Sequence, residues 1–208
     1  SYATQGLLAN ELGGDGLPRA SKSSLGDGPE WIFNPAKAGE SWMTSARLNA
    51  SMEFLYEPTT GYYEYNSDDN HVLWDASSNT LRQHMGAYPG GLSGGFYPFN
   101  NCYDKDENYH FGMSMKVNFA MPADGYVDEE PVIFEFTGDD DLWVFVDGKL
   151  ALDLGGIHPA RSGKINFATG EIWHDQTRNS NGGNESSNTM WSLYTGENTG
   201  GQYKRNVG

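Results

Sequence analysis

Residues 134–158 read FEFTGDDDLWVFVDGKLALDLGGIH, and this stretch contains most of what predicts the fold. The runs 142–146 and 149–154 flank the pair Asp147-Gly148, and both residues of such a pair readily take the positive φ angles of a tight hairpin turn. Another apolar run, 132–136, precedes three consecutive aspartates. The stretch therefore predicts three strands, with the aspartates on the loop between the first and the second.

The segments on both sides continue this pattern of short strands and turns. Residues 110–122 alternate apolar and polar side chains at a strict period of two, which predicts one strand with one buried face. Residues 52–66 contain two aromatic runs around a Pro-Thr-Thr-Gly turn, and residues 164–173 contain two short runs around Ala-Thr-Gly, so each predicts a hairpin. The sequence therefore predicts an all-β fold, an antiparallel β-sandwich with long loops.

The chain of 208 residues is long enough for a substantial core, and we expect a single β-sandwich domain over residues 1–208. Residues 1–50 are rich in Gly, Ser and Ala and show no clear amphipathic helix, so they predict an irregular N-terminal region. Residues 174–208 are polar and rich in Gly, Asn and Ser, which indicates a loop-rich tail.

The charge balance narrows the classes of partner. The chain has 28 acidic and 13 basic residues, a formal net charge of -15, whereas nucleic acids and anionic lipid surfaces need a basic face. We therefore expect no nucleic-acid partner. No apolar run reaches the length of a membrane span, so we also expect no membrane insertion. The single cysteine, Cys102, excludes an intrachain disulfide.

Several catalytic and metal-binding motifs lack the context that their chemistry needs. Residues 91–95, GLSGG, match a nucleophile elbow, but no strand-turn-helix pattern surrounds them. Asp104, Asp106 and Asn108 open an EF-hand pattern that has Tyr109 where a glycine is required. An acidic β-sandwich leaves glycosidase chemistry open, but the spacing selects no carboxylate pair. We therefore expect that the chain is not an enzyme.

The three aspartates, Asp139, Asp140 and Asp141, have two interpretations. Like charges this close repel one another, and burying one of them without a partner costs several kcal/mol. In a solvated turn, the carboxylates would accept hydrogen bonds from backbone amides. In a metal site, they would supply the hard oxygen ligands that Ca²⁺ takes. Spacing alone does not choose between the two.

The stretch 134–158, together with HFGMSMKVNFAMPADG before it and SGKINFATGEI after it, closely resembles the fibro-slime domain of bacterial surface proteins. That domain belongs to the superfamily of the anthrax protective-antigen lectin module, which yeast flocculins and epithelial adhesins share. The resemblance extends from Gly61 to Ile172. It implies the jelly-roll or barrel form of the sandwich that these lectins have.

The resemblance also implies a calcium site. In the lectins, an aspartate pair at the position of Asp139 and Asp140 binds Ca²⁺, and the ion in turn binds sugar hydroxyls. Asp141 would be a further ligand or a contact to the bound partner. The other ligand-binding candidates are His158, which closes the loop after LDLGG, Trp173 as a stacking surface, and Asn184 and Asn188 for the amide that completes the lectin site.

These implications predict a secreted or cell-surface adhesion module that binds a glycan or glycoprotein in a calcium-dependent manner. We expect it to be part of a larger multidomain bacterial surface protein. Three alternatives stay open. The chain would be a structural stalk or tip domain that uses calcium only for stability, a polysaccharide-degrading enzyme or an accessory domain of one, or a binder of a peptide or protein receptor.

Overall fold

The computed structural model describes residues 3–22, 32–39, 46, 49–88, 95–100, 108–139, 141–174 and 177–178. Apart from short helical turns such as the 3-10 helix η2 (Pro35–Lys37), the regular structure of these residues is β-strand, and most ladders are antiparallel. The prediction of an all-β sandwich is confirmed, and the described strands form no closed barrel. The chain divides into two compact units, residues 1–33 with 114–208 and residues 34–113. One domain over 1–208 stays a prediction.

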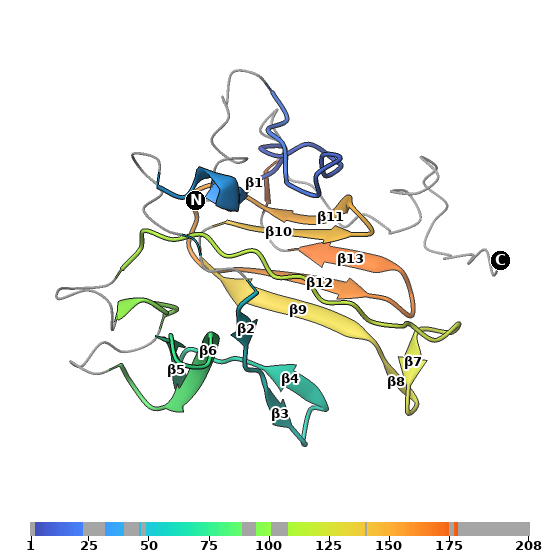
Figure 1. Cartoon of the computed structure of the whole chain (residues 1–208). Coiled ribbons are helices and arrows are strands. Elements are labelled where there is room, and N and C mark those ends of the chain that lie inside the picture. Colours follow the sequence, from blue (N-terminus) through green and yellow to red (C-terminus); the bar gives the residue numbers. More distant parts are fainter. Residues whose placement is uncertain are drawn as a thin grey trace. The chain divides into compact units, whose positions relative to one another are not determined.

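The first unit contains a two-stranded hairpin and a three-stranded sheet (Figure 1). The hairpin consists of β10 (Leu142–Val146) and β11 (Lys149–Leu154), and the sheet has the order β13 (Glu171–His174), β12 (Arg161–Asn166), β9 (Ile133–Gly138). Shorter pairs join β1 (Ala3–Thr4) to β14 (Thr177–Arg178) and β7 (Tyr126–Val127) to β8 (Glu130–Pro131). Asp147 and Gly148 have φ angles of 48° and 79°, as the sequence predicts for this turn.

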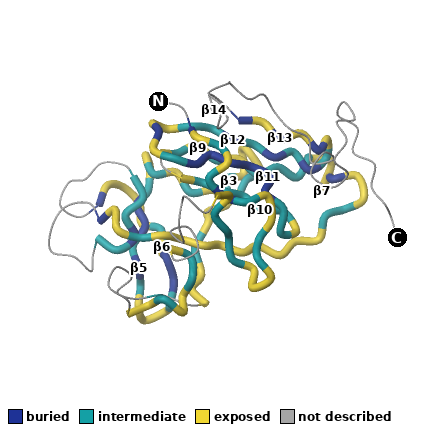
Figure 2. Tube along the Cα trace, turned by 90° about the horizontal axis from the view of Figure 1, so that it is seen from above, coloured by how far each residue is buried: buried dark blue, intermediate teal, exposed yellow. Residues whose placement is uncertain are grey.

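The hairpin packs against the sheet through one shared core. Leu152, Leu154, Ile165 and Ile172 are each at most 1% exposed and belong to the same cluster, and Figure 2 marks such buried residues in dark blue. A Cβ at Gly163 would lie 2.6 Å from Leu152 Cδ2. The glycine therefore lets β12 approach the hairpin closely, because any larger side chain would displace Leu152.

The first residues of the chain lie along the other side of β11. Leu150 N–H donates to Asn10 O at 2.9 Å, and Leu12 N–H donates to Gly148 O at 2.9 Å. Leu8 is 2% exposed. The predicted irregular N-terminal region thus includes a segment, residues 3–12, that covers the hairpin and contributes to the core.

The second unit is built around another hairpin. Its strands are β2 (Ser51–Met52), β3 (Leu55–Glu57), β4 (Tyr62–Glu64), β5 (Asn70–Asp75) and β6 (Thr80–Met85). Antiparallel pairing of β3 with β4 confirms the hairpin predicted in residues 52–66. Val72, Trp74 and Leu81 form its core. The buried hydroxyl of Tyr88 donates to Val72 O at 3.1 Å and accepts from Tyr97 N–H at 2.7 Å.

The predicted core strand at 110–122 is wrong. These residues belong to no strand, and several apolar side chains of the alternating row are exposed, including Val117 at 65% and Phe119 at 52%. Ring contacts to the cores come near the two ends of the segment: the Phe111 ring lies 5.8 Å from that of Phe99, and the Phe119 ring lies 5.2 Å from that of Phe167. Alternation shows which side chains share a face of an extended chain, but a strand also needs a hydrogen-bonded neighbour.

Candidate functional site

The aspartate loop connects the sheet to the hairpin. Asp139 follows the last residue of β9 and Asp141 precedes the first residue of β10, and both side chains are exposed. Asp140 lies outside the described residues. On β9, Glu135 and Thr137 are exposed, and Asp139 continues this outward-facing row at the period of a strand. The loop therefore presents carboxylates to solvent at one end of the sandwich.

A fourth aspartate, Asp153, lies on the strand that pairs with β10. It is on β11 directly opposite Trp143 of β10, and it is 9% exposed. Gly6 N–H donates to its Oδ2 at 2.8 Å. Its Oδ1 and the indole Nε1 of Trp143 are buried, and neither has a hydrogen-bond partner among the described residues. The carboxylate is thus buried with one of its two oxygens unsatisfied.

Burial raises the pKa of Asp153 above the ordinary value of aspartate. The Gly6 N–H, the nearby Trp143 indole and the Gly155 N–H oppose this rise, since each favours the ionised carboxylate, and the negative charge of Asp141 adds to it. The Trp143 indole lowers the pKa of Asp153 although its Nε1 does not meet the geometric criteria of a hydrogen bond to the carboxylate. Asp141 and Asp153 are therefore within electrostatic reach of each other.

A basic residue also lies at this end of the sheet. Arg161 pairs with Gly138, the residue that precedes Asp139, in the β9–β12 ladder. Its guanidinium Nη1 donates to Ala160 O at 3.4 Å. The protein therefore supplies a positive charge beside the loop, and this charge offsets part of the repulsion among the carboxylates.

His158, a ligand-binding candidate from the sequence, lies in the loop that follows β11, and its side chain is buried. It is 4% exposed, its Nδ1 lies 2.9 Å from Pro159 O, and its Nε2 lies 3.1 Å from Leu154 O. Carbonyl oxygens only accept, so both contacts are hydrogen bonds only when the ring carries two N–H groups. With one N–H, the ring donates to one of these two carbonyls, and that hydrogen bond holds the loop that follows β11.

Of the remaining candidates, Trp173 is described and the two asparagines are not. Trp173 is 42% exposed on β13, opposite Lys164, which forms an ion pair with Glu135 at 2.9 Å. Asn184 and Asn188 lie outside the described residues. Within the described parts of the chain, no three His, Cys, Asp or Glu side chains converge as a metal site would require.

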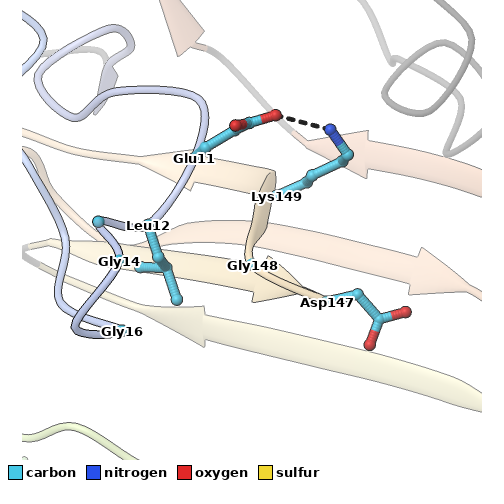
Figure 3. Close-up of a pocket in the computed structure, with 8 residues that line it drawn as sticks. Glu11, Leu12, Gly14, Gly16, Asp147, Gly148 and Lys149 are labelled. Atoms are coloured by element: carbon cyan, nitrogen blue, oxygen red, sulfur yellow. Dashed lines mark hydrogen bonds and ion pairs between the residues drawn. The ribbon is translucent and has the colours of Figure 1, made fainter.

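A shallow pocket of about 440 Å³ lies at the other end of the hairpin (Figure 3). Residues 11–14, Gly16 and residues 147–149 line it. Glu11 Oε1 and Lys149 Nζ are 2.7 Å apart, so the charges on its wall compensate each other, and the Asp147 carboxylate points away from this pair. This pocket is separate from the aspartate loop, and the Glu11–Lys149 pair leaves the Asp147 carboxylate as the other charge that lines it.

Asp153 is the site residue that the sequence interpretation missed. One feature of the sequence could have identified it, namely a single acidic residue in the apolar run LALDL. A charge at an otherwise buried strand position costs free energy unless it is paired or binds a ligand. The covering segment around Gly6 is 147 residues away in sequence, and no local pattern predicts that contact.

No helix in the described residues is long and apolar enough to cross a bilayer. No family model matches the chain. No solved structure matches it either.

The curated relatives that match the chain include the proteins psiF, psiB and psiG of Dictyostelium discoideum. Protein psiF is 30% identical over 183 residues, which cover 84% of this chain and 24% of psiF. Protein psiB is 30% identical over 139 residues, 67% of this chain and 22% of psiB, and protein psiG is 29% identical over 179 residues, 78% and 21%. The chain spans less than a quarter of the length of these relatives.

The expected membership of the bacterial fibro-slime family is wrong. The matching relatives are psi proteins of Dictyostelium, which is a eukaryote, and no family model supports the bacterial assignment. The lectin-type jelly roll or barrel implied by that assignment loses its basis as well. The comparisons thus relate the chain to a segment of the longer Dictyostelium psi proteins.

Proposed function

We propose that the chain is a calcium-dependent carbohydrate-binding module with an adhesive role, acting outside the cell as part of a longer protein. The observation that carries this proposal is the exposure of Asp139 and Asp141 at the end of the sandwich. Carboxylate oxygens are preferred ligands of Ca²⁺, which takes six to eight oxygens. An ion held by exposed carboxylates keeps outer positions that water or the vicinal hydroxyls of a sugar can fill.

Two further features support a carbohydrate as the partner. The formal net charge of -15 disfavours polyanionic partners. Trp173 exposes part of its ring on the outer face of the same sheet, beside the ion-paired Lys164 and Glu135. Such a surface offers an apolar ring for stacking and polar groups for hydrogen bonds, the combination that small-molecule sites use.

A glycan array tests the proposal directly. We expect the wild-type chain to bind one class of glycan in millimolar calcium and to lose this binding in excess EDTA. Asp139→Asn should lose most of the binding in calcium. Asp147→Asn is the matched control, because it removes one exposed carboxylate at the opposite end of the same hairpin. Equal glycan binding by wild type and Asp139→Asn would contradict the proposal.

A structural role for calcium is the second candidate. Asp153 is buried between the hairpin and the N-terminal segment, so an ion near it would tie these two parts of the first unit together. A calcium-dependent rise in melting temperature without glycan binding would favour this role. Release of reducing ends from soluble polysaccharides would instead indicate an enzyme, and binding to a peptide library would indicate a peptide receptor.

A further inference from the structure

Asp141, Trp143 and Asp153 share one face of the β10–β11 hairpin. Asp153 is directly opposite Trp143 in the ladder. Asp141 precedes Trp143 by two residues, the spacing at which side chains return to the same face of an extended chain. Asp141 and Asp153 are therefore diagonal neighbours, and side chains in this relation reach each other across a strand pair.

The fold leaves one oxygen of Asp153 unsatisfied. Gly6 N–H occupies Oδ2, whereas Oδ1 is buried without a hydrogen-bond partner among the described residues. A buried polar atom in this state costs about 1–3 kcal/mol, and more when it is charged. An asparagine at this position would accept from Gly6 N–H without burying a charge. The presence of a carboxylate at this position therefore points to a ligand for Oδ1.

The charges indicate what kind of ligand this is. The carboxylates of Asp141 and Asp153 lie within electrostatic reach, and Arg161 at the same end of the sheet offsets only part of their repulsion. A neutral hydrogen-bond donor would leave the rest of that repulsion in place. A divalent cation would satisfy Oδ1 and neutralise both charges at once. Ca²⁺ suits the position because it accepts carboxylate, carbonyl and water oxygens in an irregular arrangement.

We propose that Asp153 Oδ1 and the carboxylate of Asp141 bind one Ca²⁺ ion together, which makes Asp153 the inner ligand of the calcium site at the aspartate loop. This inference rests on the proposed function. Because Asp153 is buried and Asp141 is exposed, the ion lies at the boundary between the interior and the solvent. The Gly6 N–H fixes the orientation of the buried carboxylate.

Calorimetric titration of the full 208-residue chain with calcium alone tests the inference. Asp153→Asn keeps the size of the side chain and an acceptor for Gly6 N–H, but it removes the charge. We expect this variant to bind calcium at least roughly 10- to 100-fold more weakly, because loss of even an outer residue that supports a metal ligand costs this much. Asp147→Asn should bind calcium like the wild type.

The outcomes separate the inference from the proposed function. If the wild type and Asp153→Asn bind calcium equally and Asp139→Asn binds weakly, Asp153 is not a ligand, and the proposed function stands. If the wild type binds no calcium, both fail. If Asp153→Asn loses its far-ultraviolet circular dichroism signal, Asp141→Asn replaces it, since that side chain is exposed. If Asp141→Asn binds calcium with the affinity of the wild type, Asp141 and Asp153 do not bind one ion together.

Terbium, a luminescent probe for calcium sites, gives an independent measurement. The indole of Trp143 is near the Asp153 carboxylate, so terbium bound there should emit when the indole is excited. Trp143→Phe should lose most of this emission while calcium affinity stays within about threefold, a change below 1 kcal/mol. Unchanged emission from Trp143→Phe would place the ion elsewhere.

Discussion

The hairpins β5–β6 and β10–β11 each contain an aspartate, and their carboxylates have opposite environments. Asp75, at the end of β5, accepts hydrogen bonds from Ser77 N–H, from the hydroxyls of Ser77 and Ser78, and from Arg82 Nε. Asp153, in β11, accepts a hydrogen bond from Gly6 N–H, and its Oδ1 has no hydrogen-bond partner among the described residues. The first carboxylate is half-buried and holds a turn together, whereas the second is buried at a cost to stability.

The pKa values move in opposite directions for the same reason. The hydroxyls of Ser77 and Ser78, followed by the Ser77 N–H and Arg82, hold the pKa of Asp75 well below its usual range. Burial raises the pKa of Asp153. A residue that lowers the stability of its own fold is a candidate for function, whereas a fully hydrogen-bonded residue needs no explanation beyond structure.

The largest expected effect tests the core beneath the β10–β11 hairpin. Leu152 is 1% exposed and packs against Gly163 of β12. Leu152→Ala should lower the free energy of unfolding by about 2–5 kcal/mol, because it removes buried methyl groups and leaves a cavity. Urea denaturation measures this change. Ile157→Ala, at a side chain that is 90% exposed, should change it by less than about 0.5 kcal/mol.

The next effect tests whether the second unit depends on satisfied polar groups. Tyr88→Phe removes the hydroxyl that accepts from Tyr97 N–H and donates to Val72 O. We expect a loss of about 1–3 kcal/mol in urea denaturation, because buried backbone groups lose their partner. Tyr63→Phe, at a side chain that is 72% exposed, is the control. If both variants lower the free energy of unfolding by the same small amount, the hydrogen bonds of the Tyr88 hydroxyl do not stabilise the second unit.

A smaller effect should appear as opposite pH dependence in the two hairpins, measured in EDTA. The raised pKa of Asp153 means that its ionisation opposes folding, so its contribution is most favourable in acid and declines as the pH rises through the raised value. Asp153→Asn should therefore gain stability relative to the wild type between about pH 4 and pH 7. A constant difference across this range would contradict the assignment.

Asp75 should behave in the reverse manner. Its lowered pKa means that its contribution is present above the ordinary pKa of aspartate and is lost as the pH falls. Asp75→Asn should therefore be less stable than the wild type at neutral pH, and the difference should shrink below about pH 4. Melting temperatures across the same buffers report both variants. If the melting temperatures of the two variants change with pH in the same direction relative to the wild type, the two aspartates do not have opposite pKa shifts.

The smallest effect concerns the segment 110–122. Val117 is 65% exposed, so Val117→Thr should change the free energy of unfolding by less than about 0.5 kcal/mol. In a core strand, the same hydroxyl would be buried and would cost at least about 1 kcal/mol. Urea denaturation distinguishes the two. A loss of that larger size would restore the strand that alternation predicts.

Much of the fold was predictable from short stretches of sequence. The turn at Asp147-Gly148, the strands on either side of it and the hairpin in 52–66 follow from properties of neighbouring residues, namely φ preference and apolar runs. The position of the aspartates between β9 and β10 follows from the same strands. These features depend on backbone geometry within a few residues, which the sequence contains directly.

The tertiary structure alone decided which faces of the strands and extended segments are covered by other parts of the chain. Residues 110–122 have a regular alternation, yet no strand pairs with them in the described part of the chain. Asp153 is in an ordinary strand, yet the N-terminal segment buries it through Gly6. Both outcomes depend on contacts between residues far apart in the chain, whose formation is governed by the packing of the whole unit rather than by local preference. The sequence by itself therefore determined the strands and the aspartate loop, and tertiary packing decided which carboxylate became the buried one.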